Sequence, residues 1–124
     1  MLAGIYNITC QQGSTFARTI TFKYPDPLSP PNDPTYLLWD FTDYTARMHV
    51  RRTIDSSTIL ISLTTENGRI TLGGPTGIIE LNITAADTAA LTSSGVYDLE
   101  IISDTGVVDR IMQGNFTLSQ EVTR

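Results

Sequence analysis

Few side chains in this 124-residue chain could carry out acid–base chemistry. His49 is the only histidine, and it lies between Arg47 and Arg51 on one face of an alternating segment. Two neighbouring cations make it a poor general base, and no nucleophile with an orienting group accompanies it. Asp98 and Glu100 are two residues apart on the solvent side of a predicted strand, without an apolar pocket to give them different roles. The sequence therefore predicts no enzymatic activity.

Metal, phosphate and cofactor sites are not expected either. A calcium loop needs alternating Asp and Asn with a distal Glu, and this chain offers only isolated aspartate pairs. The Gly-rich residues 73–77 lack the Gly-Lys-Ser/Thr that opens a phosphate-binding helix, so we expect a tight turn there. Cys10 is the only cysteine, which excludes an internal disulfide and a cysteine-based zinc site, and we expect it to be buried. The aspartate pairs are Asp40 with Asp43 and Asp104 with Asp109.

The charge balance argues against nucleic acid as a partner. Thirteen acids against eight bases give a formal net charge of -5, and Arg51 with Arg52 is the only adjacent pair of cations. Binding through phosphate neutralisation needs a basic surface. The first residues show no signal-peptide pattern, and no stretch approaches the roughly 20 apolar residues of a membrane span. We therefore expect a protein made in a cytosol, with no membrane partner.

The clearest strand signal is the segment from Phe41 to Arg52. Small and apolar side chains alternate there with charged ones, as in a strand with one face on a core and the other in water. The predicted core face holds Ala46, Met48 and Val50, and the predicted solvent face holds Arg47, His49 and Arg51.

Further strands are predicted from similar patterns bounded by turn signals. Arg18 interrupts one apolar face, which a strand end beyond the core would explain. Asn67-Gly68 is a strong hairpin signal, and Gly114 indicates a bulge or the close approach of another backbone. The only helical signal is at residues 84–91, with Thr84 as its cap. The further strands are expected at residues 6–10, 16–24, 59–64, 70–72, 78–81, 95–101 and 107–118.

These elements predict the fold class. Seven or eight short strands with regular turn signals are typical of an all-β protein, here a single immunoglobulin-like β-sandwich with one short helical crossover. A chain of 124 residues can bury a core as one domain, so residues 1–124 are expected to form one unit. The edge strands contain few charges or prolines, which favours contacts with partners.

Two segments are expected to lie outside this sandwich. Residues 25–35 contain five of the six prolines and should form an exposed loop. Tyr36-Leu37-Leu38-Trp39 follows without alternation; it covers one open end of the core or contacts another subunit. After Leu118 the chain has no turn residues and few apolar groups, which predicts an extended C-terminal tail at residues 119–124.

Several short motifs along the chain resemble a known family. These are Gln12-Gly13 before Thr15-Phe16, residues 41–48, residues 63–70, Gly95 with residues 97–100, Arg110 with Gly114, and residues 121–124. In these motifs the chain resembles small virion-associated proteins of tailed bacteriophages, common in cyanophages. It is more distantly similar to the N-terminal, virion-anchoring domain of baseplate upper proteins. The segment from Pro25 to Trp39 departs from the family, which usually has a short turn there.

The resemblance implies a non-enzymatic structural component of a virion tail or baseplate that connects or anchors fibres. Such a protein is assembled in the host cytoplasm, is present in several copies, and has other virion proteins as partners. A capsid decoration protein is the alternative of the same class, and a carbohydrate-binding module using Tyr36, Trp39 and Tyr44 is the alternative of another class. The residues expected to contact neighbouring subunits are Tyr36, Leu37, Leu38, Trp39, Glu121 and Val122.

Overall fold

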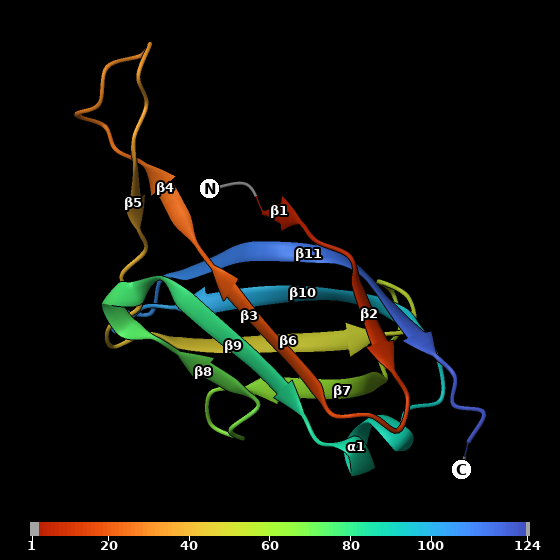
Figure 1. Cartoon of the computed structure of the whole chain (residues 1–124). Coiled ribbons are helices and arrows are strands. Elements are labelled where there is room, and N and C mark those ends of the chain that lie inside the picture. Colours follow the sequence, from red (N-terminus) through yellow and green to blue (C-terminus); the bar gives the residue numbers. More distant parts are fainter. Residues whose placement is uncertain (1–2, 124) are drawn as a thin grey trace.

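The computed structural model describes residues 3–123, which form an all-β protein of packed sheets (Figure 1). The larger sheet has the order β1-β11-β10-β6-β7, with β2 also paired to β11. Its strands are β1 (Gly4–Ile5), β2 (Ile8–Gln11), β6 (Thr45–Arg51), β7 (Ile59–Thr64), β10 (Gly95–Ile102) and β11 (Val108–Ser119).

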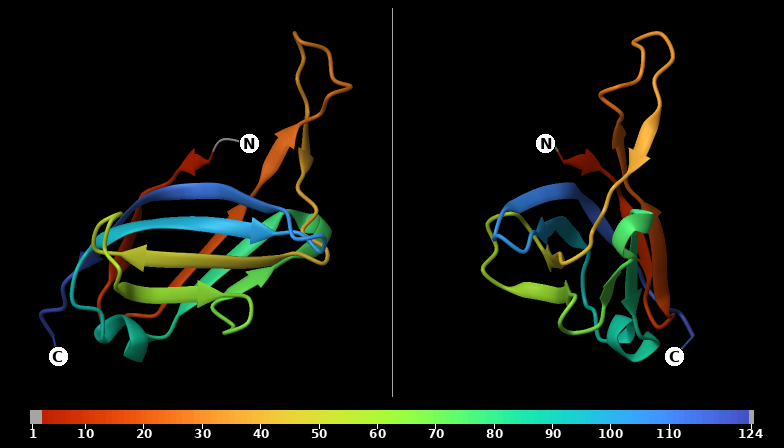
Figure 2. Two further views of the ribbon diagram at one scale, coloured as in Figure 1. Left: turned by 180° about the vertical axis from the view of Figure 1, so that it is seen from behind. Right: turned by 90° about the vertical axis from the view of Figure 1, so that its left-hand side faces the viewer.

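A three-stranded sheet, β3-β9-β8, packs against the larger one. Its strands are β3 (Phe16–Thr21), β8 (Ile70–Leu72) and β9 (Ile78–Ile83). A separate hairpin of β4 (Lys23–Pro25) and β5 (Tyr36–Leu38) extends from the body, as both views in Figure 2 show. The described residues thus form eleven strands rather than seven or eight, because this hairpin and the short β1 add to the sandwich. The immunoglobulin-like variant of the class stays a prediction.

The predicted register of the segment from Phe41 to Arg52 is confirmed. Ala46, Met48 and Val50 of β6 are at most 1% exposed, and they belong to the core between the sheets. The strand is central in its sheet, with antiparallel neighbours β10 and β7. Its alternation is clear because one face packs on the core and the other carries charges into solvent.

The helix and the crossover are also confirmed. Helix α1 (Ala85–Ala89) leads from β9 in one sheet to β10 in the other, and the Thr84 hydroxyl accepts a hydrogen bond from the Asp87 amide. The hydroxyl of buried Thr88 donates to the Ser14 carbonyl at 2.8 Å and accepts from the Gly13 amide at 3.0 Å. These bonds hold α1 against the turn between β2 and β3. Among residues 3–123, no helix has the length and apolar character to cross a membrane.

Asn67-Gly68 does not form the predicted hairpin turn. The strands on either side, β7 and β8, belong to different sheets, so the segment crosses over the core edge. The Asn67 side chain accepts from the Thr64 and Arg69 amides, each at 3.0 Å, and donates to the Ser62 carbonyl at 2.9 Å. These bonds replace the strand pairing that a hairpin would provide, and they cover part of the open edge of β7.

Arg18 is not at a strand end, contrary to expectation. It lies within β3, where its guanidinium donates to the Thr9 carbonyl at 3.1 Å and sits 4.8 Å from the centre of the Phe16 ring. The side chain thus bridges the open side between the two sheets with its stem on the core and its charge outside. Next to it, burial raises the pKa of the Cys10 thiol, which is buried as expected.

Another backbone approaches Gly114 closely, which is one of the two alternatives predicted for it; the other was a bulge. A Cβ at this position would lie 2.4 Å from the Tyr6 carbonyl oxygen. The register shift of the β10–β11 pair is elsewhere, between Leu99 and Glu100 on β10. Gly114 therefore lets the N-terminal segment run directly along β11.

Met48→Asp is expected to lower the free energy of unfolding by several kcal/mol, because it places a carboxylate in the core. Arg47→Gln is the matched control and should cost less than about 1 kcal/mol, since its ion pair with Glu100 is solvent-exposed. Urea unfolding of the two variants measures the difference. Similar losses for both would contradict the register.

Candidate functional site

The first candidate site is the hairpin of residues 23–38, which we call the arm. It projects from the body (Figures 1 and 2), and it carries exposed apolar side chains. Leu28, in its loop, is 92% exposed, the highest value among the apolar side chains of the arm. The others are Tyr24, Tyr36, Leu37 and Leu38. These residues lie on one projection, which concentrates apolar surface where a partner can reach it.

The arm is a hairpin rather than the loop alone. Residues 26–35 are a loop as predicted, but Pro25 ends β4 and pairs with Tyr36 at the start of β5. A proline is compatible with this position because the end of an edge strand does not require its N–H. The segment from Tyr36 to Leu38 is therefore a strand that presents side chains to solvent.

Trp39 has a different environment from the three residues before it. It is half-buried, and its ring stacks on Phe41 with centroids 5.9 Å apart while Tyr24 meets it edge-on at 6.0 Å. Phe22 and Tyr44 each meet Phe41 edge-on at 6.1 Å. These five rings form an aromatic cluster that covers one end of the core. Trp39 thus covers the core, as one alternative for residues 36–39 predicted, whereas contact of the exposed Tyr36 to Leu38 with another subunit stays a prediction.

The base of the arm is fixed to the three-stranded sheet by backbone hydrogen bonds. The Phe22 amide donates to the Gly77 carbonyl at 2.7 Å, and the Trp39 amide donates to the Phe22 carbonyl at 3.0 Å. The Phe41 amide donates to the Gly74 carbonyl at 2.8 Å. The predicted tight turn is the 3-10 helix η1 (Gly74–Thr76) followed by Gly77, and it supplies the Gly74 and Gly77 carbonyls. The direction of the arm is therefore set by the body of the protein.

The C-terminal tail lies at the far end of the molecule from the arm (Figure 1). It begins later than predicted, because Ser119 still belongs to β11 and pairs with Gln11. The Glu121 amide donates to the Gln12 side chain at 2.9 Å, and Val122 is 93% exposed. Arg124, the last residue of the predicted tail, lies outside the described residues. The structure thus separates the two predicted contact segments.

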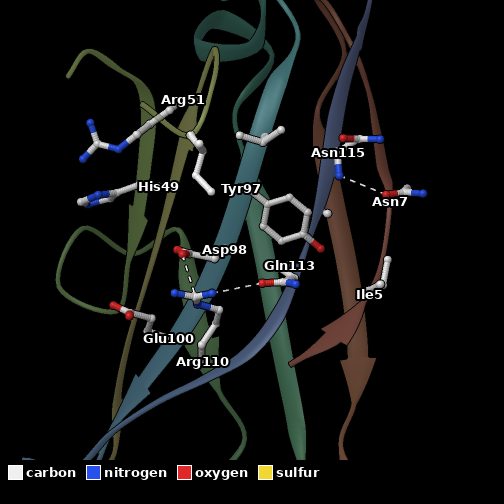
Figure 3. A pocket seen from close by; sticks show the side chains of 13 residues that line it. Ile5, Asn7, His49, Arg51, Tyr97, Asp98, Glu100, Arg110, Gln113 and Asn115 are labelled. Carbon is white, nitrogen blue, oxygen red and sulfur yellow. Dashed lines mark hydrogen bonds and ion pairs between the residues drawn. The ribbon is translucent and has the colours of Figure 1, made fainter. Parts of the chain in front are cut away.

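A second candidate site is a groove on the outer, polar face of the six-stranded sheet (Figure 3). Its volume is about 680 Å³, and β1, β6, β10 and β11 contribute to its lining. Exposed Ile5 and Ile54 with half-buried Val96 are its apolar members. The polar members are Asn7, His49, Arg51, Asp98, Glu100, Arg110, Gln113 and Asn115.

The acids of the groove are paired with arginines. Arg110 lies 3.4 Å from the Asp98 carboxylate and donates to the Gln113 side-chain oxygen at 3.3 Å (Figure 3). Glu100 forms an ion pair at 2.8 Å with the neighbouring Arg47. Because cations engage both carboxylates at a solvent-exposed surface, this geometry suits binding rather than proton transfer.

Tyr97 holds the N-terminal side of the groove in place. Its ring is buried, and its hydroxyl donates to the Tyr6 carbonyl, between groove residues Ile5 and Asn7. Burial raises the pKa of Tyr97 well above its ordinary value, so the hydroxyl remains a donor at physiological pH. Sequence analysis placed Tyr97 only within a predicted strand. It missed the groove because the lining residues come from four strands, from the segment between β1 and β2 and from the segment after β6.

Comparisons with known proteins do not assign a family: the chain matches no protein-family model and no curated protein. Within the described part of the chain, no group of three or more His, Cys, Asp and Glu side chains is arranged to hold a metal ion. For carbohydrate binding, Tyr36 is exposed, whereas Trp39 and Tyr44 are half-buried in the aromatic cluster. The arm and the groove are thus the features on which a functional proposal can rest.

Trp39→Ala is expected to lower the free energy of unfolding by about 1–3 kcal/mol, because it removes a half-buried ring from the aromatic cluster. Leu37→Ala is the control from the same segment and should cost less than about 1 kcal/mol, since Leu37 is exposed. Urea denaturation followed by circular dichroism provides both values. An equal cost at the two positions would show that the cluster does not anchor the arm.

Proposed function

We propose that this chain is a non-enzymatic structural subunit of a tailed-bacteriophage virion, a tail or baseplate protein that connects or anchors fibres. The observation that carries the proposal is the arm, a projection with exposed apolar side chains on a fixed base. Apolar anchors presented on a rigid element are typical of protein-binding surfaces, because little conformational entropy is lost on docking.

The exposure of the arm supports an assembled state. Leu28, Leu37 and Leu38 remain in contact with water in the free chain, although leucine is among the residues most often buried. A partner that covered these side chains would add about 25 cal/mol for each Å² of apolar surface removed from water. Because the arm lies away from both sheets, a partner can bind it without changing the core.

The motif resemblance indicates which kind of assembly the chain would join. The quoted motifs lie mainly on strands and turns of the sandwich, whereas the arm falls in the segment where the family usually has a short turn. The common part is thus the body, and the arm is the feature that would give this chain its own contacts. A capsid decoration protein has the same need for a docking element, so the location in the particle decides between the two.

The double variant Leu28→Asp with Leu37→Asp should reduce incorporation into particles by about tenfold or more while the free protein stays folded, because two exposed anchors are lost. Val107→Asp is the control, because it also replaces an exposed apolar side chain by an acid but lies in a turn of the body. Quantitative mass spectrometry of purified particles measures incorporation, and antibody labelling in electron microscopy gives the location.

Equal incorporation of the arm variant and the Val107→Asp control would overturn the docking role of the arm. Labelling of the capsid surface instead of the tail would replace the tail or baseplate assignment by the decoration alternative.

A further inference from the structure

We propose, on the basis of the proposed function, that the partner of the arm is a second copy of this chain, and that the tip of the arm docks into the groove of the next copy. The two surfaces lie on different parts of the molecule. β6 begins at Thr45, near the aromatic cluster at the base of the arm, and ends at Arg51 in the groove. Docking is therefore between copies rather than within one chain.

Charge complementarity is the first argument. Residues 24–46 contain four aspartates and no Lys, Arg or His, and two of these aspartates, Asp26 and Asp33, are in the loop of the arm. In the groove, Arg51 donates to the Ser56 carbonyl at 3.0 Å, and its guanidinium is within ion-pair distance of no carboxylate in residues 3–123. An acidic loop would give Arg51 the charged partner that it lacks within its own chain.

Hydrogen-bonding chemistry is the second argument. The Asn7 side-chain oxygen accepts from the Asn115 amide at 3.0 Å, and the Gln113 side-chain oxygen accepts from Arg110 (Figure 3). The NH₂ groups of Asn7 and Gln113 donate no hydrogen bond within residues 3–123, so they are available as donors. The loop is their complement, because prolines have a carbonyl acceptor but no N–H donor. The loop prolines are Pro27, Pro30, Pro31 and Pro34.

Apolar surface is the third argument. Leu28 in the loop of the arm is 92% exposed, and the groove presents Ile5 and Ile54 at 79% and 86% exposure. The groove volume of about 680 Å³ is in the range of pockets that bury a compact ligand, here Leu28 with the preceding Pro27. Docking would cover an apolar anchor on one copy and an apolar rim on the other.

The contact is heterologous, since the arm and the groove are different surfaces. Repetition of such a contact produces a closed ring or an open chain of subunits. The inference therefore states how several copies come together.

Complementary variants of the full chain test the inference. The arm variant is Leu28→Ser with Asp33→Lys, and the groove variants are Arg51→Glu and, separately, Ile54→Asp at an exposed position. Asp104→Lys, in the exposed turn between β10 and β11, is the control. Light scattering coupled to size-exclusion chromatography and analytical ultracentrifugation report the molar mass over a range of concentrations.

The wild type and the control should self-associate with rising concentration, whereas each arm or groove variant should bind itself about tenfold or more weakly. An equimolar mixture of the arm variant and a groove variant should form a 1:1 dimer, because one intact arm and one intact groove remain and chain growth is blocked.

Three results would overturn the inference: a monomeric wild type at every concentration, groove variants that associate as the wild type does, or a mixture that stays monomeric. If such a result coincides with poor incorporation of the Leu28→Asp, Leu37→Asp double variant into particles, the arm binds a different protein and the proposed function stands. If that double variant also incorporates normally, the proposed function fails as well.

Discussion

The arm depends on a close backbone contact at Gly77. This residue is buried and has a φ of +71°, and a Cβ there would lie 2.6 Å from the Phe22 carbonyl oxygen. Only glycine combines a left-handed backbone with such an approach at little cost. The contact lets the Phe22 amide reach the Gly77 carbonyl, and Trp39 then pairs with Phe22. The chain can therefore leave β3, form the arm and return at a fixed place.

The aromatic cluster stabilises this base from the side of the core. Phe41 is buried at its centre, with contacts to Phe22, Trp39 and Tyr44. Phe41 also precedes β6, the strand whose apolar face lies in the core between the sheets. The position of the arm is thus coupled to the most buried part of the protein, while its tip remains in solvent.

Sequence patterns predicted the elements whose environment is local. Met48 and Val50 alternate with charged residues, and Thr84 caps a short helix, so neighbours along the chain reveal both elements. The sequence did not reveal which sheet each strand joins. Asn67-Gly68 has the chemistry of a hairpin turn, yet β7 pairs with β6 in one sheet and β8 pairs with β9 in the other.

The candidate site was predictable in part for the same reason. Exposed apolar residues after a proline-rich loop indicated a contact segment, and the structure places Tyr36 to Leu38 on the arm. Leu28 was missed because a single leucine among prolines and aspartates gives no periodic signal. The groove was missed because strands distant in sequence bring Asn7, Arg51 and Gln113 to one surface.

Amide hydrogen exchange, measured on the free chain and on the assembled particle, tests the central claim most directly. In the free chain, the amides of Phe22, Trp39 and Phe41 should be protected, while those of residues 26–35 should exchange rapidly apart from the hydrogen-bonded ones. Assembly should slow exchange in the arm. Rapid exchange at the base in the free chain, or an arm that exchanges equally fast in the particle, would contradict a fixed arm that docks on a partner.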